Sequence, residues 1–178
     1  MKNSDKKIGK ILISEDEIKA KLEEMGKAIA HDYEGKSPLM IGVLKGAFIF
    51  MADLIRAIEI DCEVDFMAVS SYGAATKSSG VVRIIKDLDI DLTDRHVILV
   101  EDIIDSGLTL SYLRKNLLAR KPASLEICAM FIKKDLQKAN VECKYEGFSI
   151  PPDFVVGYGL DAREQFRGLN YLAEYIEE

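Results

Sequence analysis

The chain has 178 residues, of which 48% are hydrophobic and 30% charged, and its net charge at pH 7 is -6. A chain of this length buries roughly 70% of its unfolded surface, so the composition indicates one globular domain over residues 1–178 rather than a disordered chain. The negative charge argues against a general nucleic-acid-binding protein, which needs a basic face to neutralise phosphates.

The cysteines and the first residues indicate where the protein resides. Cys62, Cys128 and Cys143 are odd in number and have no CxxC spacing, which argues against a disulfide framework and against a zinc site. The stretch MKNSDKKIGKILISEDEI lacks the apolar region of a signal peptide, and no stretch has the roughly 20 apolar residues of a membrane span. We therefore expect a cytoplasmic protein with no membrane partner.

The first third of the chain predicts a helix, a strand and a second helix. Ser14 and Glu17 have the spacing of a capping box, and apolar residues then recur at helical intervals until residue 29. This pattern predicts a first helix that ends near Gly35. The apolar run LMIGVL predicts a short strand, and a tight turn at Lys45-Gly46 then leads into a second helix through residue 58.

The remaining elements alternate in the same way. EVDFMAVSSY and VVRIIKDL predict strands on either side of the small, polar loop GAATKSSG. HVILV predicts a buried strand, and leucines 110, 113 and 117 then share one face of a helix. SLEICAMFI and DFVVGYG predict two further strands. Strands that alternate with helices predict an α/β fold with a doubly wound, mostly parallel sheet flanked by helices.

Three carboxylates follow the buried strand HVILV within five residues, at Glu101, Asp102 and Asp105. In α/β sheets ligands bind beyond the carboxyl ends of the strands, and a turn of small residues before a helix can hold a phosphate with its N–H groups. Carboxylates are poor phosphate ligands, so Glu101 and Asp102 are expected to contact sugar hydroxyls or a hard cation. The alternative is structural: Asp105 or Ser106 caps the helix, and Glu101-Asp102 is a solvated strand end.

The stretch VILVEDIIDSGLTL contains neither GxxxxGK[ST] nor GxGxxG, but it resembles the phosphoribosyl-pyrophosphate signature of the phosphoribosyltransferases. More narrowly, the chain resembles the hypoxanthine-guanine phosphoribosyltransferase family over nearly its whole length. This resemblance implies the type I fold of the family, with a small hood built from the chain termini. The pieces that carry it, in the order of the family, are VLKGAFIFMADL, SSYG, VEDIIDSGLTL, FIKK, PDFVVGYGLD and FRGLNYL.

The resemblance also implies roles for the carboxylates and for the loop after them. Glu101 and Asp102 would lie near the ribose hydroxyls and their Mg²⁺, Asp161 would hold a second Mg²⁺, and Asp105 would be the catalytic carboxylate that faces purine N7. Leu108 stands where some family members have a lysine, so backbone amides must supply more of the phosphate contact. The residues implied to hold the 5′-phosphate are Ser106, Gly107, Leu108 and Thr109.

On the purine side, the resemblance implies that Lys133 donates a hydrogen bond to the 6-oxo group. Phe154 would stack on the purine, and the backbone of Val155 would meet its edge. On the pyrophosphate side, Arg167 would contact pyrophosphate directly. Lys45 and Gly46 would present backbone amides to it, through a non-proline cis peptide, and Ser71-Tyr72 would lie on a mobile lid.

Taken singly, these residues have ordinary structural explanations. The alternatives are a solvated strand end for Lys133-Lys134, core packing for Phe154 and Val155, a surface charge for Arg167, a turn for Asp161 and a plain hairpin loop for GAATKSSG. Their joint order in the sequence favours the site.

The activity implied is purine salvage, in which a 6-oxopurine and phosphoribosyl pyrophosphate give IMP or GMP and pyrophosphate, with Mg²⁺ as cofactor. A homo-oligomer, a dimer or a tetramer, is also expected. One alternative is a different base, xanthine or adenine, although Lys133 opposes adenine because the amino group would meet a second donor. Another is a regulator that keeps the fold and binds RNA or DNA, which the acidic balance and the complete set of family motifs oppose.

Overall fold

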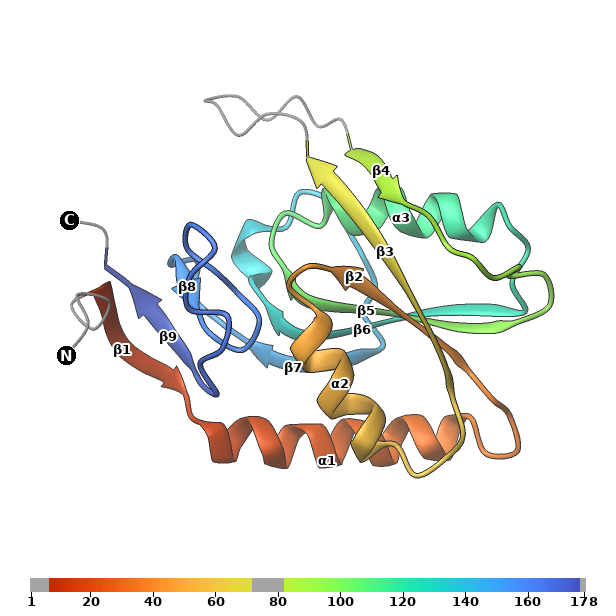
Figure 1. Ribbon diagram of the computed structural model, residues 1–178, viewed down its shortest axis with the longest axis horizontal. Helices are drawn as coiled ribbons and strands as arrows, with labels where there is room; N and C mark the ends of the chain where they lie inside the picture. The colour runs from red at the N-terminus through yellow and green to blue at the C-terminus, as the bar shows by residue number, and fades with distance from the viewer. Residues whose placement is uncertain (1–6, 72–81, 177–178) are drawn as a thin grey trace.

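A six-stranded sheet forms the centre of the computed structural model, which describes residues 7–71 and 82–176 (Figure 1). Its strand order is β4-β3-β2-β5-β6-β7, and every neighbouring pair is parallel except β3 with β4, which is antiparallel. The predicted α/β fold with a mostly parallel sheet is therefore confirmed. The strands are β2 (Leu39–Leu44), β3 (Glu63–Ser71), β4 (Val82–Lys86), β5 (His96–Ile104), β6 (Ser124–Ile132) and β7 (Tyr145–Ser149).

Helices cover both faces of this sheet, as in a doubly wound fold (Figure 1). α1 (Glu15–Asp32) and α2 (Phe48–Ala57) share one buried apolar cluster with the sheet, whereas α3 (Leu108–Leu118) belongs to a second cluster. The predicted capping box begins α1, because Ser14 Oγ accepts a hydrogen bond from Glu17 N and the Glu17 carboxylate accepts one from Ser14 N at 2.8 Å.

The strand β5 is longer than the apolar run HVILV predicts. Glu101 pairs with Ala129 of β6, and the ladder continues to Ile104, which pairs with Ile132. The expected strand end at the acidic pair is therefore wrong, because backbone hydrogen bonds to β6 extend the strand whatever the side chains are. The carboxylates consequently project from a rigid strand instead of a loop.

A second sheet, of three antiparallel strands, stands beside the main one in the order β1-β9-β8 (Figure 1). Its strands are β1 (Ile8–Ile13), β8 (Val155–Val156) and β9 (Leu172–Tyr175), and it is the small hood that the resemblance implies. The strand predicted over residues 153–159 is too long. Gly157, Tyr158 and Gly159 have φ angles of 106°, 48° and 99°, which turn the backbone out of the sheet.

The short 3-10 helix η2 (Lys134–Leu136) lies between β6 and β7. Within residues 7–71 and 82–176, the structure has no helix with the length and apolar character needed to cross a membrane.

Candidate active site

A cavity of about 360 Å³ lies at the carboxyl ends of the parallel strands β2, β5 and β6. Ligands of α/β sheets bind at this edge because the loops that follow the strands meet there. All but two of the lining residues, Ile103 and Leu160, belong to the predicted site. The lining residues are Lys45, Gly46, Asp102, Ile103, Asp105, Lys133, Phe154, Val155, Leu160, Asp161 and Arg167.

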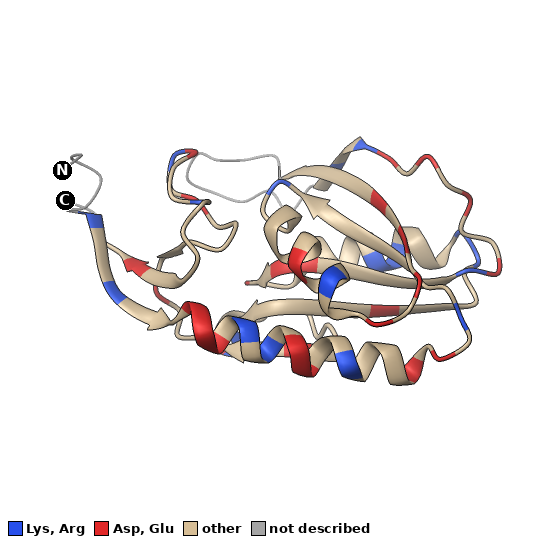
Figure 2. Ribbon diagram, turned by 60° about the horizontal axis from the view of Figure 1, so that its bottom comes forward, with Lys and Arg blue, Asp and Glu red and all other residues tan. Residues whose placement is uncertain are grey.

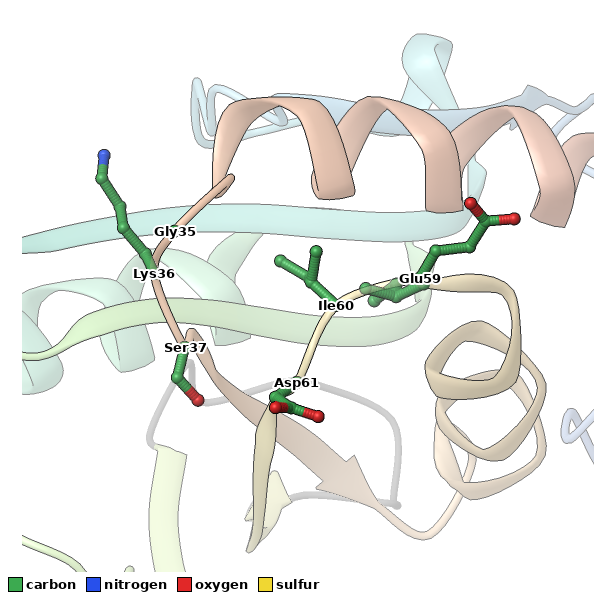
Figure 3. A pocket seen from close by; sticks show the side chains of 7 residues that line it. Gly35, Lys36, Ser37, Glu59, Ile60 and Asp61 are labelled. Atoms are coloured by element: carbon green, nitrogen blue, oxygen red, sulfur yellow. The ribbon is translucent and has the colours of Figure 1, made fainter.

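A larger cavity, of about 640 Å³, lies at the opposite end of the sheet, between the loop before β2 and the loop before β3. Figure 3 shows that the side chains of Lys36 and Glu59 in its lining point away from each other. A ligand site needs polar groups that converge on the ligand, so the smaller cavity is the candidate active site.

The loop between β5 and α3 lines a third cavity, of about 90 Å³, which shares Ile103 and Asp105 with the candidate site. Its other lining residues are Glu101, Ile104, Ser106, Gly107, Thr109 and Leu110. The N-cap of α3 is Gly107, with a φ of 75°, so the alternative of a helix cap at Asp105 is wrong. Ser106 precedes the N-cap, and its Oγ accepts a long hydrogen bond from Leu108 N, at 3.5 Å. The first N–H groups of a helix are free to bind an anion, which fits the predicted phosphate loop.

Contacts on its far side hold this loop in place. The carbonyl of Ser106 accepts hydrogen bonds from Lys138 N at 2.9 Å and from Ala139 N at 3.2 Å. A β-carbon at Gly107 would lie 2.9 Å from the carbonyl oxygen of Ala139, so this close approach requires glycine. The loop is therefore shaped before any ligand arrives.

The acidic pair of β5 serves two cavities, because consecutive residues of a strand point to opposite faces. Glu101 lines the small cavity of the loop, and Asp102 lines the candidate site. Asp102 is only 8% exposed, and its Oδ1 accepts a hydrogen bond from Ile103 N at 2.8 Å. Burial raises the pKa of Asp102 to about 6, although nearby Arg167 opposes the rise. Burial, with the neighbouring Asp102 charge, also raises the pKa of Glu101 well above its usual value.

The donor set suits Mg²⁺ that is shared with a substrate. Within residues 7–71 and 82–176, no three His, Cys, Asp or Glu side chains are grouped so as to hold a metal alone. Mg²⁺ keeps several waters and usually takes one or two protein carboxylates together with substrate phosphates. Asp102 and Asp161 line one cavity and fit this pattern. In the same described part, Glu101 Oε2 is buried without a hydrogen-bond partner, as expected of an acceptor that awaits one.

The two lysines after β6 have different environments. Lys133 is 7% exposed and lines the candidate site, and its backbone N–H donates to Ile104 O at 2.9 Å. Lys134 is exposed, and its Nζ lies 2.9 Å from Glu146 Oε2. The alternative of a solvated strand end is therefore wrong for Lys133, while Lys134 fits it. A buried ammonium at a cavity wall is a strong donor for a ligand carbonyl.

Phe154 and Val155 also line the candidate site. Phe154 is 57% exposed, and its ring meets the ring of Tyr175 edge-on with a centroid distance of 5.5 Å. Core packing, the alternative for both residues, is therefore wrong for Phe154 and holds for Val155, which is buried and pairs with Glu174 of β9. An exposed aromatic face at a cavity is a stacking platform for a planar ligand.

Two cations stand at the mouth of the cavity. Arg167 donates through Nη1 to Gly159 O at 2.8 Å, and its Nη2 lies 2.7 Å from Asp161 Oδ1 and 3.4 Å from Glu164 Oε2. Lys45 Nζ lies 3.0 Å from Glu164 Oε1. Arg167 is therefore not a simple surface charge, since three partners fix its orientation.

The turn after β2 packs tightly on its neighbours. The peptide bond between Leu44 and Lys45 is cis, as the resemblance implies. A β-carbon at Gly46 would overlap the carboxylate of Asp102, and one at Gly159 would overlap the carbonyl oxygen of Gly46. Glycine at both positions therefore brings three segments of the site together.

Comparison with known proteins bears on the same residues. A model of the phosphoribosyl transferase domain matches residues 10–163, which include the acidic pair and the phosphate loop. The chain belongs to the phosphoribosyltransferase family. The matched region ends at residue 163. Arg167 of this phosphoribosyltransferase therefore lies outside the matched region.

Two relatives show which branch of the family is similar. This phosphoribosyltransferase is 52% identical over 171 residues to the hypoxanthine-guanine phosphoribosyltransferase of Mycobacterium tuberculosis, covering 93% of this chain and 85% of that one. It is 51% identical over 165 residues to the hypoxanthine-guanine phosphoribosyltransferase of Bacillus subtilis, covering 93% and 92% of the two chains.

Solved structures give the same result for the fold of this phosphoribosyltransferase. It resembles a hypoxanthine phosphoribosyltransferase of Staphylococcus aureus with a TM-score of 0.93 and 40% identity, covering 98% of this chain and 95% of that one. It resembles a hypoxanthine-guanine phosphoribosyltransferase of Bacillus anthracis with a TM-score of 0.88 and 42% identity, covering 95% and 99%.

Two features of the phosphoribosyltransferase site were not predicted from its sequence. Tyr158 is buried, and its hydroxyl donates to Asp53 Oδ2 at 2.9 Å, which ties the turn after β8 to α2. Glu164 joins the two cations at the mouth of the cavity. The glycines around Tyr158 were the only available signal, because they indicate a tight turn. Of the predicted lid, Ser71 ends β3 and Tyr72 lies outside the described residues.

Proposed function

We propose that this phosphoribosyltransferase transfers the 5-phosphoribosyl group of phosphoribosyl pyrophosphate to hypoxanthine or guanine, giving IMP or GMP and pyrophosphate. The observation that carries the proposal is the convergence of a buried lysine, a carboxylate and an exposed aromatic ring beside a phosphate-sized loop. The hypoxanthine-guanine enzymes named above support the same activity, since they are about half identical to this chain.

The purine lies, in this proposal, in the 360 Å³ cavity. Phe154 stacks on its face, the backbone of Val155 meets its edge, and Lys133 donates to its 6-oxo group. This donor selects against adenine, whose 6-amino group would leave the buried ammonium without an acceptor. Asp105 faces N7, where a carboxylate can take or share the proton that the base exchanges during the reaction.

The phosphoribosyl donor lies along the carboxyl end of β5. Its 5′-phosphate binds the N–H groups of residues 106–109 and the hydroxyls of Ser106 and Thr109 at the start of α3. Leu108 is exposed and offers only its backbone, so the loop geometry carries this contact. Glu101 and Asp102 accept hydrogen bonds from the ribose hydroxyls.

The chemistry is the replacement of the anomeric C–O bond to pyrophosphate by a C–N bond to a ring nitrogen of the purine, which gives up one proton. Positive charge develops on the ribosyl ring while negative charge grows on the departing pyrophosphate, so stabilising both charges lowers the barrier. Arg167 and the backbone amides of Lys45 and Gly46 hold the pyrophosphate, and the buried carboxylates of β5 face the ribose. Positioning of the two substrates supplies the rest, and no covalent nucleophile is needed.

We assign Mg²⁺ as the cofactor on the strength of the carboxylates. Asp102 would hold one ion with the ribose hydroxyls, Glu101 would approach the same ribose from the adjoining cavity of the phosphate loop, and Asp161 would hold a second ion with pyrophosphate. When bound, Mg²⁺ neutralises phosphate charge and makes pyrophosphate a better leaving group. A chelator in excess is expected to abolish turnover and to leave the far-ultraviolet circular dichroism spectrum unchanged; full activity under these conditions would contradict the assignment.

We also propose a cytoplasmic protein that forms a dimer or a tetramer and has no nucleic-acid partner. Lys and Arg are interspersed with Asp and Glu along α1 rather than gathered on one face (Figure 2). A mixed surface with a net charge of -6 favours a small anionic ligand in a local site over a polyanion. Sedimentation of the purified protein measures the oligomer directly.

Initial rates with hypoxanthine, guanine, xanthine and adenine, at saturating phosphoribosyl pyrophosphate and Mg²⁺, test the proposed function. We expect nucleoside monophosphate with hypoxanthine and guanine and none with adenine. Turnover with adenine but with none of the other three bases would contradict the proposed role of Lys133 as donor to a 6-oxo group. Absence of turnover with every base, together with tight binding of RNA or DNA at physiological salt, would favour the regulator instead.

A further inference from the structure

The carboxylate of Glu164 bridges two cations that come from different segments of the candidate site. Its Oε1 lies 3.0 Å from Lys45 Nζ, and its Oε2 lies 3.4 Å from Arg167 Nη2. Lys45 follows β2, whereas Arg167 belongs to the segment between β8 and β9. Both cations line the 360 Å³ cavity, and Glu164 does not, so its carboxylate approaches them from the rim.

The arrangement of the cations is that of a site for a phosphate-type anion. Arg167 offers a planar fork of donors, which suits the oxygens of a phosphate, and Lys45 offers a compact charge across the cavity mouth. The Glu164 carboxylate uses one donor group of each. Asp161 Oδ1 lies 2.7 Å from the same Nη2 of Arg167 that faces Glu164, so an incoming anion meets cations that already have carboxylate partners.

The backbone around Glu164 is held in an uncommon conformation. Arg163, Glu164 and Phe166 have φ angles of 53°, 62° and 75°, and none of them is glycine. Side chains disfavour this left-handed region, so surrounding contacts must hold such a segment in place. Hydrogen bonds between Ala162 and Gln165 and the two ion pairs of Glu164 provide these contacts.

We infer that Glu164 is an internal anion that competes with pyrophosphate for Lys45 and Arg167. The inference rests on the proposed function, because it deepens the pyrophosphate site, and it adds the Lys45 ammonium to that site. Glu164 thereby weakens the binding of pyrophosphate, as product and as part of the donor, without contacting the purine or the ribose. Its side chain is 65% exposed, so it can swing into solvent when the substrate anion takes its partners.

The size of the effect follows from the exposure of the pairs. Exposed ion pairs are weak, so removing the Glu164 charge is expected to tighten pyrophosphate binding by roughly three- to tenfold. The KM for phosphoribosyl pyrophosphate should fall in the same direction. The KM for hypoxanthine should stay the same, because the ion pairs of Glu164 are with Lys45 and Arg167 and involve neither Lys133 nor Phe154.

The test compares Glu164→Gln with Glu63→Gln by titration calorimetry of pyrophosphate in Mg²⁺. Glu63 is a matched control: it is half-exposed and pairs with Arg95 at 2.5 Å, at the amino end of β3, away from the site. We expect tighter binding for Glu164→Gln and unchanged binding for Glu63→Gln. Unchanged or weaker binding in Glu164→Gln would overturn the inference, since weaker binding would mean that Glu164 positions the cations or holds the metal.

Repeating the substitution in a Lys45→Met protein separates competition for Lys45 from other effects of the Glu164 charge on pyrophosphate binding. In Lys45→Met, removal of the Glu164 charge should tighten pyrophosphate binding less than in the parent, because one of the two contested cations is gone. Equal gains in both backgrounds would contradict competition for Lys45. Glu164→Ala serves as a second charge-removing variant if Glu164→Gln folds poorly. Turnover of the parent protein is measured first, and its absence would contradict the proposed function. Normal turnover of the parent together with unaltered pyrophosphate binding in Glu164→Gln would contradict only this inference.

Discussion

The carboxylate of Asp102 lies directly against the α-carbon of Gly46, so closely that a β-carbon at position 46 would overlap Asp102 Oδ2. We predict that Gly46→Ala displaces either the turn after β2 or the carboxylate. The KM for phosphoribosyl pyrophosphate should rise at least tenfold, since a displacement of about 1 Å at a positioned group costs on the order of a hundredfold in rate. Gly168→Ala is the control, because a β-carbon there meets no atom within 4 Å. A normal KM in Gly46→Ala would show that the contact is not required.

Asp102 should also make stability depend on pH. Its pKa is about 6 in the folded protein and 3.8 in the unfolded chain, so the folded state binds the proton more tightly. The contribution of Asp102 to the free energy of unfolding is fully present below about pH 4 and is lost as pH rises through 6. The loss is at most about 3 kcal/mol. Asp102→Asn should therefore raise the Tm at pH 7.5 and leave it nearly unaltered at pH 4.

Asp65 provides the contrast to Asp102, since it is equally buried but accepts hydrogen bonds from Phe66 N at 2.7 Å and Asp89 N at 3.0 Å. Asp65→Asn should lower the Tm at pH 7.5, because an amide accepts at only one of its two positions. Equal shifts in both variants would show that the hydrogen bonds of Asp65 do not distinguish the two carboxylates.

Lys133→Met removes the charge and keeps the apolar stem. The loss of a charge-assisted hydrogen bond worth about 1.5 to 3 kcal/mol should lower kcat/KM for hypoxanthine by roughly ten- to a hundredfold. Lys134→Met tests the neighbouring exposed lysine, whose partner is Glu146, and should leave this value unaltered. If the two variants behave alike, Lys133 has no role at the 6-oxo group.

Asp105→Asn keeps the shape of the side chain and removes its basicity. Because Gly107 caps α3, the substitution should not weaken the helix, and the Tm should barely move. The single-turnover rate should fall by roughly 10²- to 10⁴-fold, the usual range for lost acid-base assistance. A near-normal rate would remove Asp105 from the mechanism.

Tyr158→Phe removes the hydrogen bond between the turn after β8 and α2. Tyr145 is a matched control, because it is also buried and donates to Asp32 Oδ2 at 2.8 Å, away from the candidate site. Each variant should lose about 0.5 to 1.5 kcal/mol of stability. Only Tyr158→Phe should raise the KM for phosphoribosyl pyrophosphate, by a few fold, since Tyr158 fixes the segment that carries Asp161. Equal KM values in the two variants would assign Tyr158 a purely structural role.

The sequence predicts those strands whose burial requires a run of apolar residues. LMIGVL and SLEICAMFI are strands with the predicted bounds, because strands covered on both faces read as apolar runs. β1, β7 and β9 were missed, since they are partly exposed and therefore have no such run. The extra length of β5 was missed because pairing with β6, and not side-chain character, extends it.

In the candidate site, too, some features were predicted from the sequence and others were not. The residues of the candidate site were predicted from the order of motifs along the chain. The 360 Å³ cavity brings nine of these sixteen residues together, and four more line the cavity of the phosphate loop. The contacts of Lys45 with Glu164 and of Asp53 with Tyr158 were not predicted. Their partners are 119 and 105 residues apart, and spacing along a chain says nothing about which distant side chains meet.

The three-stranded sheet has a consequence for the order in which a newly made chain acquires its parts. β8, which follows Phe154, pairs only with β9 in that sheet, and β9 in turn pairs with β1 from the opposite end of the described chain. During translation, residues 106–109 leave the ribosome well before residues 172–175. A nascent chain therefore possesses its phosphate loop before its purine wall can close, and the stacking surface for the base is completed last.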